Sequence, residues 1–135
     1  MKAKHSMAWK ASTQTRKQRK FRYNAPLHVL GTFMHAPLIK DLRAKHGARS
    51  VRVRTGDTVR VMRGQFKGRE GKVERIEIKD SALIIAKVEQ TKRDGVTKVP
   101  YPIHASNVTI VALELTDKRR AAALKPKSTK KESKE

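Results

Sequence analysis

Residues 59–73 are the most informative stretch of the chain and read Val59-Arg-Val-Met-Arg-Gly-Gln-Phe-Lys-Gly-Arg-Glu-Gly-Lys-Val73. Apolar residues at the two ends alternate with polar ones, which predicts two short strands. Gly64, Gly68 and Gly71 lie between them, and glycine permits positive φ and a close approach of the backbone to another surface. Four cations occupy the same loop. The stretch therefore predicts a basic, glycine-spaced loop between two strands.

This glycine loop does not have the pattern of a nucleotide-hydrolysing site. A Walker loop ends in Gly-Lys-Ser/Thr and leads into a helix, and neither feature is present here. The glycine spacing is G-x3-G-x2-G between strands, which also differs from the dinucleotide-binding fingerprint.

The segments around the loop extend the strand pattern. Short apolar or alternating runs fall at residues 51–53, 59–61, 73–78, 82–89 and 107–115, and turn signals separate them at 55–57, 64–71, 79–81 and 93–95. Five short strands at this spacing predict an all-β fold, a small antiparallel barrel.

Two short helices are expected beside the barrel. The first covers residues 37–46, with Pro37 at its first position, Asp41 near its positive end and Gly47 ending it in the left-handed conformation. The second follows a cap at Thr116 or Asp117 and ends before Pro126. Residues 125–135 alternate Lys, Ser, Thr and Glu and are expected to be disordered.

The charge and composition of the chain limit the kinds of partner that it can bind. The 135 residues, enough for one core, carry 33 Lys and Arg against 12 Asp and Glu, a net charge of +21. Residues 1–54 hold 14 of these cations and a single acid, whereas residues 55–115 hold 11 cations and 8 acids. A nearly balanced module with basic extensions is typical of a protein that lies along nucleic acid.

Several other classes are not expected. The longest apolar run is residues 82–86, too short for a membrane span, and no apolar segment follows Lys2 and Lys4 as in a secretory signal. There is no cysteine, hence no disulfide and no thiolate nucleophile. His28, His35 and His46 do not cluster as metal ligands would, and Ser106 near His104 is too sparse for a nucleophile and base. We expect no enzyme activity, cofactor, metal or small-molecule substrate.

The segment before the barrel is the strongest RNA-binding candidate. Five of the seven residues from 16 to 22 are cationic, and little apolar periodicity is evident, so the segment alone is expected to be disordered. It would become ordered on RNA, with Trp9, Phe21 and Tyr23 offering faces for base stacking. A solvated tail or a transit peptide is the alternative interpretation.

A known motif matches the glycine loop and its surroundings. The pattern Gly56-Asp57-x-Val59-x-Val61-x-x-Gly64-x-x-Lys67-Gly68-x-x-Gly71-x-Val73 resembles a KOW motif, which ribosomal proteins share with transcription elongation factors of the NusG and Spt-five kind. The segments on either side of the motif favour a ribosomal protein over an elongation factor. They read Arg16-Lys17-Gln-Arg19-Lys20, Ala25-Pro26-Leu27-His28, Ala36-Pro37-Leu38-x-x-x-Leu42-Arg43, Arg49-Ser50-Val51-Arg52-Val53-Arg54, Pro102-Ile103-His104-x-Ser106-Asn107-Val108 and Leu113-x-Leu115-x-Asp117-Lys118-x-Arg120.

Over residues 12–120 the chain thus resembles the archaeal and eukaryotic branch of the large-subunit ribosomal protein called L-twenty-four in bacteria and archaea and L-twenty-six in eukaryotes. One departure is Ala105, where eukaryotic members tend to have proline. The resemblance implies an SH3-like barrel that binds large-subunit ribosomal RNA and neighbouring ribosomal proteins. It also implies a role early in subunit assembly and a place in the cytoplasmic ribosome near the polypeptide exit tunnel.

These expectations divide the chain into a basic RNA-binding extension (1–36), a short helix (37–47), an SH3-like KOW barrel (48–115) and a short helix with a basic tail (116–135). RNA contacts are predicted at Arg16, Lys17, Arg19, Lys20, Phe21, Arg22, Tyr23, His28, Arg49, Arg52, Arg54, Arg63, Gly64, Phe66, Lys67, Gly68, Arg69, Lys72, His104, Ser106, Asn107, Lys118, Arg119 and Arg120.

Two other functions fit less well. A transcription elongation module that binds RNA polymerase would carry a further domain or tandem motifs, whereas this chain spends its remaining length on basic extensions. A peptide-binding SH3 domain needs an aromatic groove, and the barrel has only Phe66 and Tyr101.

Overall fold

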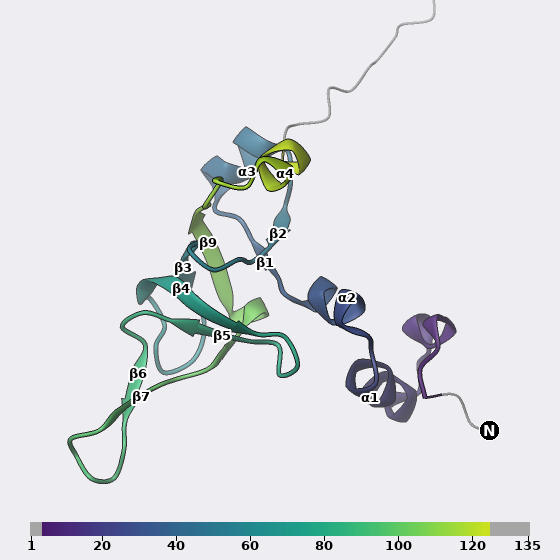
Figure 1. Cartoon of the computed structure of the whole chain (residues 1–135), viewed down its shortest axis with the longest axis horizontal. Coiled ribbons are helices and arrows are strands. Elements are labelled where there is room, and N and C mark those ends of the chain that lie inside the picture. Colours follow the sequence, from purple (N-terminus) through teal and green to yellow (C-terminus); the bar gives the residue numbers. More distant parts are fainter. Residues whose placement is uncertain (1–3, 125–135) are drawn as a thin grey trace, which may run out of the picture.

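The structure is a computed structural model that describes residues 4–124. Figure 1 shows a β-sheet unit, an N-terminal arm of helices that projects from it, and two helices side by side at one end. The elements in chain order are η1 (Met7–Ala11), α1 (Thr15–Tyr23), α2 (Leu27–Leu30), η2 (Gly31–Phe33), β1 (His35–Pro37), α3 (Lys40–His46), β2 (Ser50–Arg52), β3 (Thr58–Val61), β4 (Glu70–Glu77), β5 (Ala82–Ile85), β6 (Glu89–Thr91), β7 (Lys98–Pro100), β8 (Ile103–His104), η3 (Ala105–Asn107), β9 (Val108–Ala112) and α4 (Lys118–Ala123).

The sheet unit is a small SH3-like antiparallel barrel, as predicted. Its five-stranded sheet has the order β8-β5-β4-β3-β9, and every pairing in it is antiparallel. Strands β1 and β2 form a second, two-stranded sheet against it. One core lies inside and includes Met34, Leu38, Val59, Leu83 and Ile110, none of which has any exposed surface. Alternation places these side chains inward, and their burial is the main stabilising contribution to the fold.

The predicted strands all overlap observed ones, with two differences. The strand at 51–53 becomes β2, which pairs with β1, and the five-stranded sheet is completed by β8 instead. The strand at 82–89 ends at Ile85, because the chain turns at Lys87 with φ 67 and then enters the β6–β7 hairpin. Every residue from 89 to 102 is exposed, so this hairpin adds little to the core.

The first predicted helix begins later than expected. Pro37 is not its first residue but pairs with Ser50 in the β1–β2 sheet, and α3 starts at Lys40. The N–H of Leu38 donates to the carbonyl of Arg49, and that of Ile39 to the carbonyl of Ile110, each at 3.0 Å. These sheet contacts keep the chain extended up to residue 39. Gly47 ends the helix with φ 61, as predicted.

The N-terminal arm is helical, which corrects the expectation of disorder. Phe21, Ala25, Val29 and Leu30 form a small buried cluster, with Trp9, Phe33 and Ile78 packed on it; we call it the hinge cluster. The residues at 21, 25 and 29 recur every four positions across Pro26, a periodicity that the density of cations concealed. Because Ile78 follows β4, the hinge cluster fixes the arm to the barrel.

The C-terminal helix agrees with its predicted start. The Asp117 carboxylate accepts a hydrogen bond of 2.8 Å from the N–H of Arg119 and caps α4. The Nδ1 atom of His46 donates to the carbonyl of Leu124 at 3.1 Å, which joins the ends of α3 and α4. Pro126 and the tail at 125–135, expected to be disordered, lie outside the described residues. None of the helices within residues 4–124 is long and apolar enough to cross a membrane.

Candidate nucleic-acid interface

The glycine loop between β3 and β4 is held firmly to the barrel. Phe66 is only 5% exposed and lies 5.1 Å, between ring centroids, from Tyr101. The guanidinium of Arg69 sits 4.9 Å from the Phe66 ring, and the N–H of Gly68 donates to the carbonyl of Val61 at 2.8 Å. Phe66 therefore packs on its own loop and anchors it, with little of its ring exposed for the RNA contact predicted from the sequence.

The three glycines of this loop serve two different needs. Gly64 and Gly68 have φ of 90 and 85, and nothing lies within 4 Å of where a Cβ would be. They are required by the backbone conformation. Gly71 is packed against β5, where a Cβ would lie 2.8 Å from Cγ2 of Ile85 and closer still to the carbonyl of Ala86. It is required for close pairing of β4 and β5.

Helix α1 presents its cations to solvent. Its five predicted contacts, Arg16, Lys17, Arg19, Lys20 and Arg22, are all exposed. In the described part of the chain, none of them forms a salt bridge. The Nζ of Lys20 lies 5.3 Å from the Trp9 ring and the guanidinium of Arg22 lies 5.1 Å from that of Phe33, contacts that orient the side chains.

The two aromatic residues of α1 differ sharply in environment. Phe21 is 4% exposed, stacks on His5 at 4.8 Å and meets Phe33 edge to face at 6.3 Å. It belongs to the hinge cluster, so the base stacking predicted for it does not fit the structure. Tyr23 is 88% exposed and remains available to a base.

Arg120 is a structural residue, although sequence reasoning placed it with the RNA contacts. Its side chain is buried and forms a two-pronged ion pair with Asp57, with nitrogen to oxygen distances of 2.6 and 2.7 Å. It also donates to the carbonyls of Glu114, at 2.8 Å, and Arg52, at 3.1 Å. Asp57 further accepts from the N–H of Arg54 at 2.8 Å and of Glu114 at 2.9 Å. The pair thus pins α4 to the β2–β3 turn.

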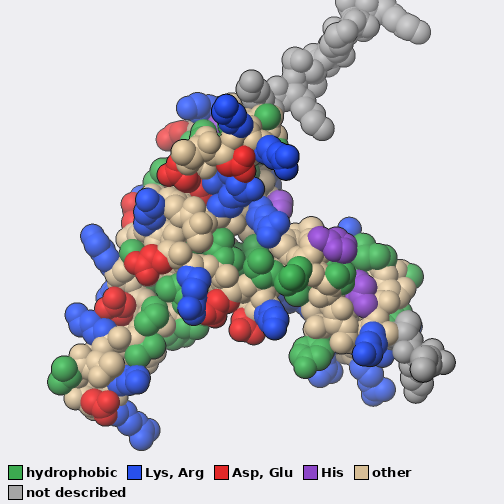
Figure 2. All heavy atoms as spheres, in the orientation of Figure 1, with side chains coloured by type: hydrophobic (Ala, Val, Ile, Leu, Met, Phe, Trp, Pro, Cys, Tyr) green, Lys and Arg blue, Asp and Glu red, His purple; other side chains and the backbone are tan. Residues whose placement is uncertain are grey.

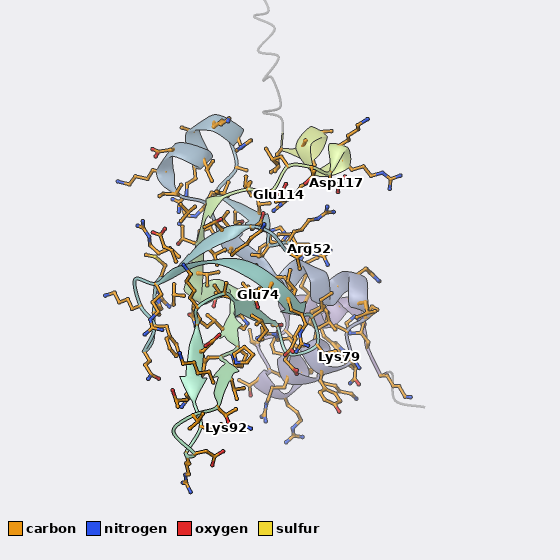
Figure 3. The ribbon with its side chains drawn as sticks, turned by 60° about the vertical axis from the view of Figure 1, so that its left-hand side comes forward. Arg52, Glu74, Lys79, Lys92, Glu114 and Asp117 are labelled. Atoms are coloured by element: carbon orange, nitrogen blue, oxygen red, sulfur yellow. The ribbon has the colours of Figure 1, made fainter. Side chains whose placement is uncertain are left out.

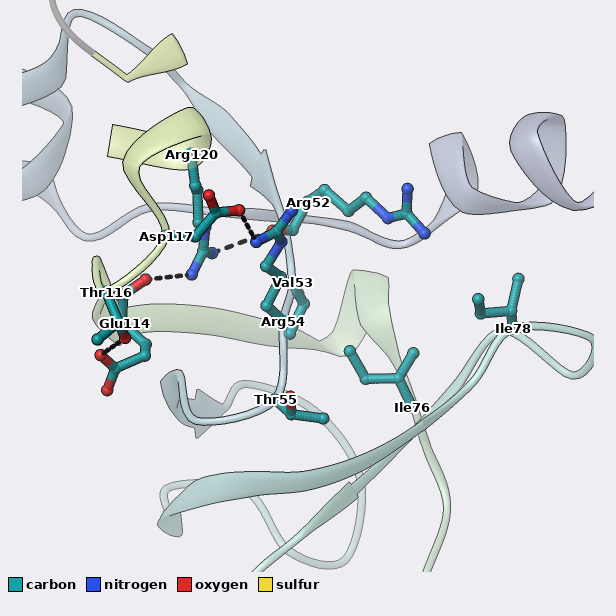
Figure 4. A pocket seen from close by; sticks show the side chains of 10 residues that line it. All are labelled: Arg52, Val53, Arg54, Thr55, Ile76, Ile78, Glu114, Thr116, Asp117 and Arg120. Atoms are coloured by element: carbon teal, nitrogen blue, oxygen red, sulfur yellow. Dashed lines mark hydrogen bonds and ion pairs between the residues drawn. The ribbon is translucent and has the colours of Figure 1, made fainter. Parts of the chain in front are cut away.

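A second, exposed pair lies beside this buried one (Figure 4). The guanidinium of Arg54 contacts the carboxylate of Asp117, and this hydrogen bond lowers the pKa of Asp117 below its ordinary value. The Thr116 hydroxyl donates to Glu114 at 2.5 Å and likewise lowers the pKa of that carboxyl. Because Asp117 occupies Arg54, this arginine is only partly available to a phosphate.

The other predicted contacts lie on the surface. They are His28, Arg49, Arg52, Arg54, Arg63, Gly64, Lys67, Gly68, Arg69, Lys72, Ser106, Lys118 and Arg119, all exposed, with His104 and Asn107 half-buried. Figure 2 shows that Lys and Arg side chains are spread over the whole visible face. The contacts therefore form separate groups on the arm, the glycine loop and the region of α3 and α4.

Sequence reasoning missed several polar residues that organise these groups. Gln18 donates from its amide to the carbonyls of Trp9 and Lys10 at 3.1 Å and of Ser12 at 2.8 Å, which ties η1 to α1. Asp57 was noted only as part of the Gly-Asp of the KOW pattern, and its pairing with Arg120 was not predicted. Lys92, Arg93 and Lys98 are further exposed cations on the β6–β7 hairpin, where the sequence indicated only the turn at 93–95. Within residues 4–124 there is no group of three or more His, Asp or Glu side chains that could hold a metal ion.

Comparisons with known proteins agree on one family. A family model that describes the eukaryotic L26 and the archaeal L24 ribosomal proteins matches residues 12–127. A protein of Methanosarcina barkeri is 54% identical over 114 residues, which cover 84% of this chain and 97% of the relative. A protein of Methanocorpusculum labreanum is 49% identical over 122 residues, 90% of this chain and the whole of the relative. Both are named large ribosomal subunit protein uL24.

Proposed function

Because this chain belongs to the family of eukaryotic and archaeal ribosomal proteins whose relatives are named uL24, we propose that it binds the RNA of the large subunit through its exposed cations. It is a structural constituent of the large ribosomal subunit. The names of the relatives do not favour the alternative of a transcription elongation module.

One observation supports RNA as the partner above the others. The exposed cations of α1 form no salt bridge within residues 4–124, so an anion from a partner would relieve their mutual repulsion. A polyphosphate backbone supplies such charge at regular spacing and releases counterions on binding.

The mode of binding is shape recognition without chemistry. A-form RNA hides its base edges in a narrow major groove, so the barrel, the arm and the glycine loop would contact phosphates, 2′-hydroxyls and unpaired bases. The family also leads us to propose contacts with neighbouring ribosomal proteins, a role early in subunit assembly and a location in the cytoplasmic ribosome near the exit tunnel.

Salt dependence tests this proposal. If about 8 phosphates are engaged, the logarithm of the affinity for large-subunit ribosomal RNA falls with the logarithm of salt at a slope of about -6. Arg16→Ala with Lys17→Ala should make that slope shallower by about 1.4, because two phosphate contacts are lost. A slope near zero for the unaltered protein contradicts RNA binding through these cations.

A matched double variant provides the control. Arg60 and Arg75 form salt bridges with Glu70 and Glu77 on the barrel, so replacing both with alanine removes the same number of positive charges from paired positions. The slope for this variant should stay close to that of the unaltered protein. Equal effects of the two double variants would show that only net charge matters, which contradicts a role for α1 in particular.

A further inference from the structure

A groove lies between the arm and the barrel, and it brings several predicted RNA contacts of α1 together with His104. One wall is formed by α1, Asn24 and Leu30 of α2, and the other by the β4–β5 turn together with His104. Its volume is about 650 Å³, within the range of sites that hold small organic groups. Figure 3 shows Lys79 on this turn, beside the N-terminal helices. We call it the hinge groove because the hinge cluster lies next to it.

The charge of the hinge groove favours an anion. Arg19, Lys20 and Arg22 line it from the arm and Lys79 from the barrel, whereas Asp80 is the one acid in its lining. Four cations from two elements therefore outnumber the one carboxylate in this lining, an excess of positive charge suited to a phosphate group.

An exposed aromatic ring stands in the same lining. Tyr23 is 88% exposed, whereas Phe21, two residues earlier, is buried in the hinge cluster. Exposure of a ring this large leaves its face without a protein partner. Bases stack on tyrosine faces in single-stranded RNA complexes, and the base of a paired nucleotide has no face free for this.

Polar groups beside the ring can recognise a base edge or a ribose. Ser81 and Asn24 line the groove with a hydroxyl and an amide. The N–H of Ser106 donates to Nδ1 of His104 at 3.2 Å, so in the neutral ring the proton is on Nε2, which is a donor. The lining thus combines cations, an aromatic face and neutral donors and acceptors, the three kinds of contact that a nucleotide makes.

We propose that the hinge groove binds one unpaired nucleotide of the large-subunit RNA, with its base stacked on Tyr23 and its phosphates against Arg19, Arg22 and Lys79. This inference rests on the RNA binding proposed above. Since one wall is the arm and the other the barrel, a nucleotide held there would also fasten the arm in the orientation seen here.

Alanine at Tyr23 tests the stacked base. Its affinity for large-subunit RNA transcribed in vitro should fall about 10-fold with an unchanged salt slope, because stacking is lost and no phosphate contact is. Tyr23→Trp, which keeps an aromatic face, should bind about as tightly as the unaltered protein. Leu27→Ala is the control, since Leu27 is also large, exposed and on the arm but lies outside the groove. Lys79→Ala should make the slope shallower by about 0.7.

Ultraviolet crosslinking identifies the nucleotide. The base joined to Tyr23, mapped by mass spectrometry and primer extension, should be unpaired in the free RNA. Normal affinity of Tyr23→Ala, or a crosslink to a paired base, overturns the hinge groove as a nucleotide site. If the effect of Arg16→Ala with Lys17→Ala persists in that case, RNA binding by the arm stands; if the unaltered protein shows no salt dependence, the proposed function fails as well.

Discussion

The arm and the barrel handle their charge in opposite ways. On the barrel, Arg60 contacts Glu70 and Arg75 contacts Glu77, so cations alternate with acids along the exposed strand faces. Exposed pairs of this kind contribute only about 0 to 1 kcal/mol each, and their main effect is to neutralise the surface. On α1 no such pairing occurs within residues 4–124. Part of the barrel's charge is therefore neutralised by its own acids, whereas the cations of α1 have no salt bridge in this part of the chain.

The two regions differ as much in their cores. The barrel buries one large cluster drawn from strands and loops that are distant in sequence, including Met34 and Ile110. The arm has a cluster of four buried residues that depends on Ile78 of the barrel. Burial scales with the stabilising free energy, so the barrel supports its own fold and the arm is ordered by attachment to it. Three predictions probe this difference, starting with the largest effect.

Replacement of Arg120 by alanine should destabilise the barrel most. It leaves the fully buried carboxylate of Asp57 without its cation, and breaking a buried pair from one side costs about 3 to 5 kcal/mol. The midpoint of urea unfolding, followed by circular dichroism, measures the loss. Arg119→Ala is the control because Arg119 is exposed on the same helix. A cost below about 1 kcal/mol would mean that α4 does not stabilise the barrel.

Replacement of Phe21 by alanine should loosen the arm and spare the barrel. The ring fills the centre of the hinge cluster, and losing it should lower the local stability of α1 by up to about 3 kcal/mol. Hydrogen exchange of the α1 amides should accelerate, while the amides of β3 and β4 keep their protection. Tyr23→Ala, on the same helix but exposed, should leave exchange unchanged. Equal loss of protection in β3 would show that arm and barrel unfold as one unit.

The smallest of the three effects is expected at low pH, where loss of the Arg54–Asp117 pair should slightly lower the stability of the fold. The hydrogen bond from Arg54 lowers the pKa of Asp117 in the folded state, so the pair stabilises the fold fully above the unfolded pKa of about 4. This contribution disappears as the pH falls through the lower folded pKa. The melting temperature of the unaltered protein should therefore decline more below about pH 4 than that of Asp117→Asn. Parallel curves for the two proteins would contradict the lowered pKa.

Local signals in the sequence located most of the fold. Gly47 ends α3, Asp117 caps α4, and the alternation in residues 59–61 marks β3, because each effect acts over a few neighbouring residues. The prediction that Pro37 begins a helix was wrong. Pro37 lies in β1 because it pairs with Ser50, which follows α3 in the sequence. The arm helix was missed for a related reason: its apolar residues pack on Ile78, which is distant in sequence.

In the candidate interface, too, local features were predictable from the sequence and those that depend on distant contacts were not. Lys and Arg are rarely buried, so the exposure of the α1 cations followed from their identity alone. Arg120 is the exception because its acidic partner lies 63 residues away, and no local pattern distinguishes it from Arg119. The hinge groove was also hidden, since its walls come together only after the arm has docked on the barrel.

The Asp57–Arg120 pair also sets an order of events during synthesis. A chain made from its N-terminus presents Asp57 well before Arg120, so the carboxylate has no buried cation while the strands are already available for pairing. Until α4 arrives, the Asp57 carboxylate lacks its buried cation, so water stabilises it better than burial in the β2–β3 turn does. Non-local contacts of this kind form slowly. The contact that joins α4 to the β2–β3 turn can therefore form only after nearly all of the residues that the structure describes have been synthesised.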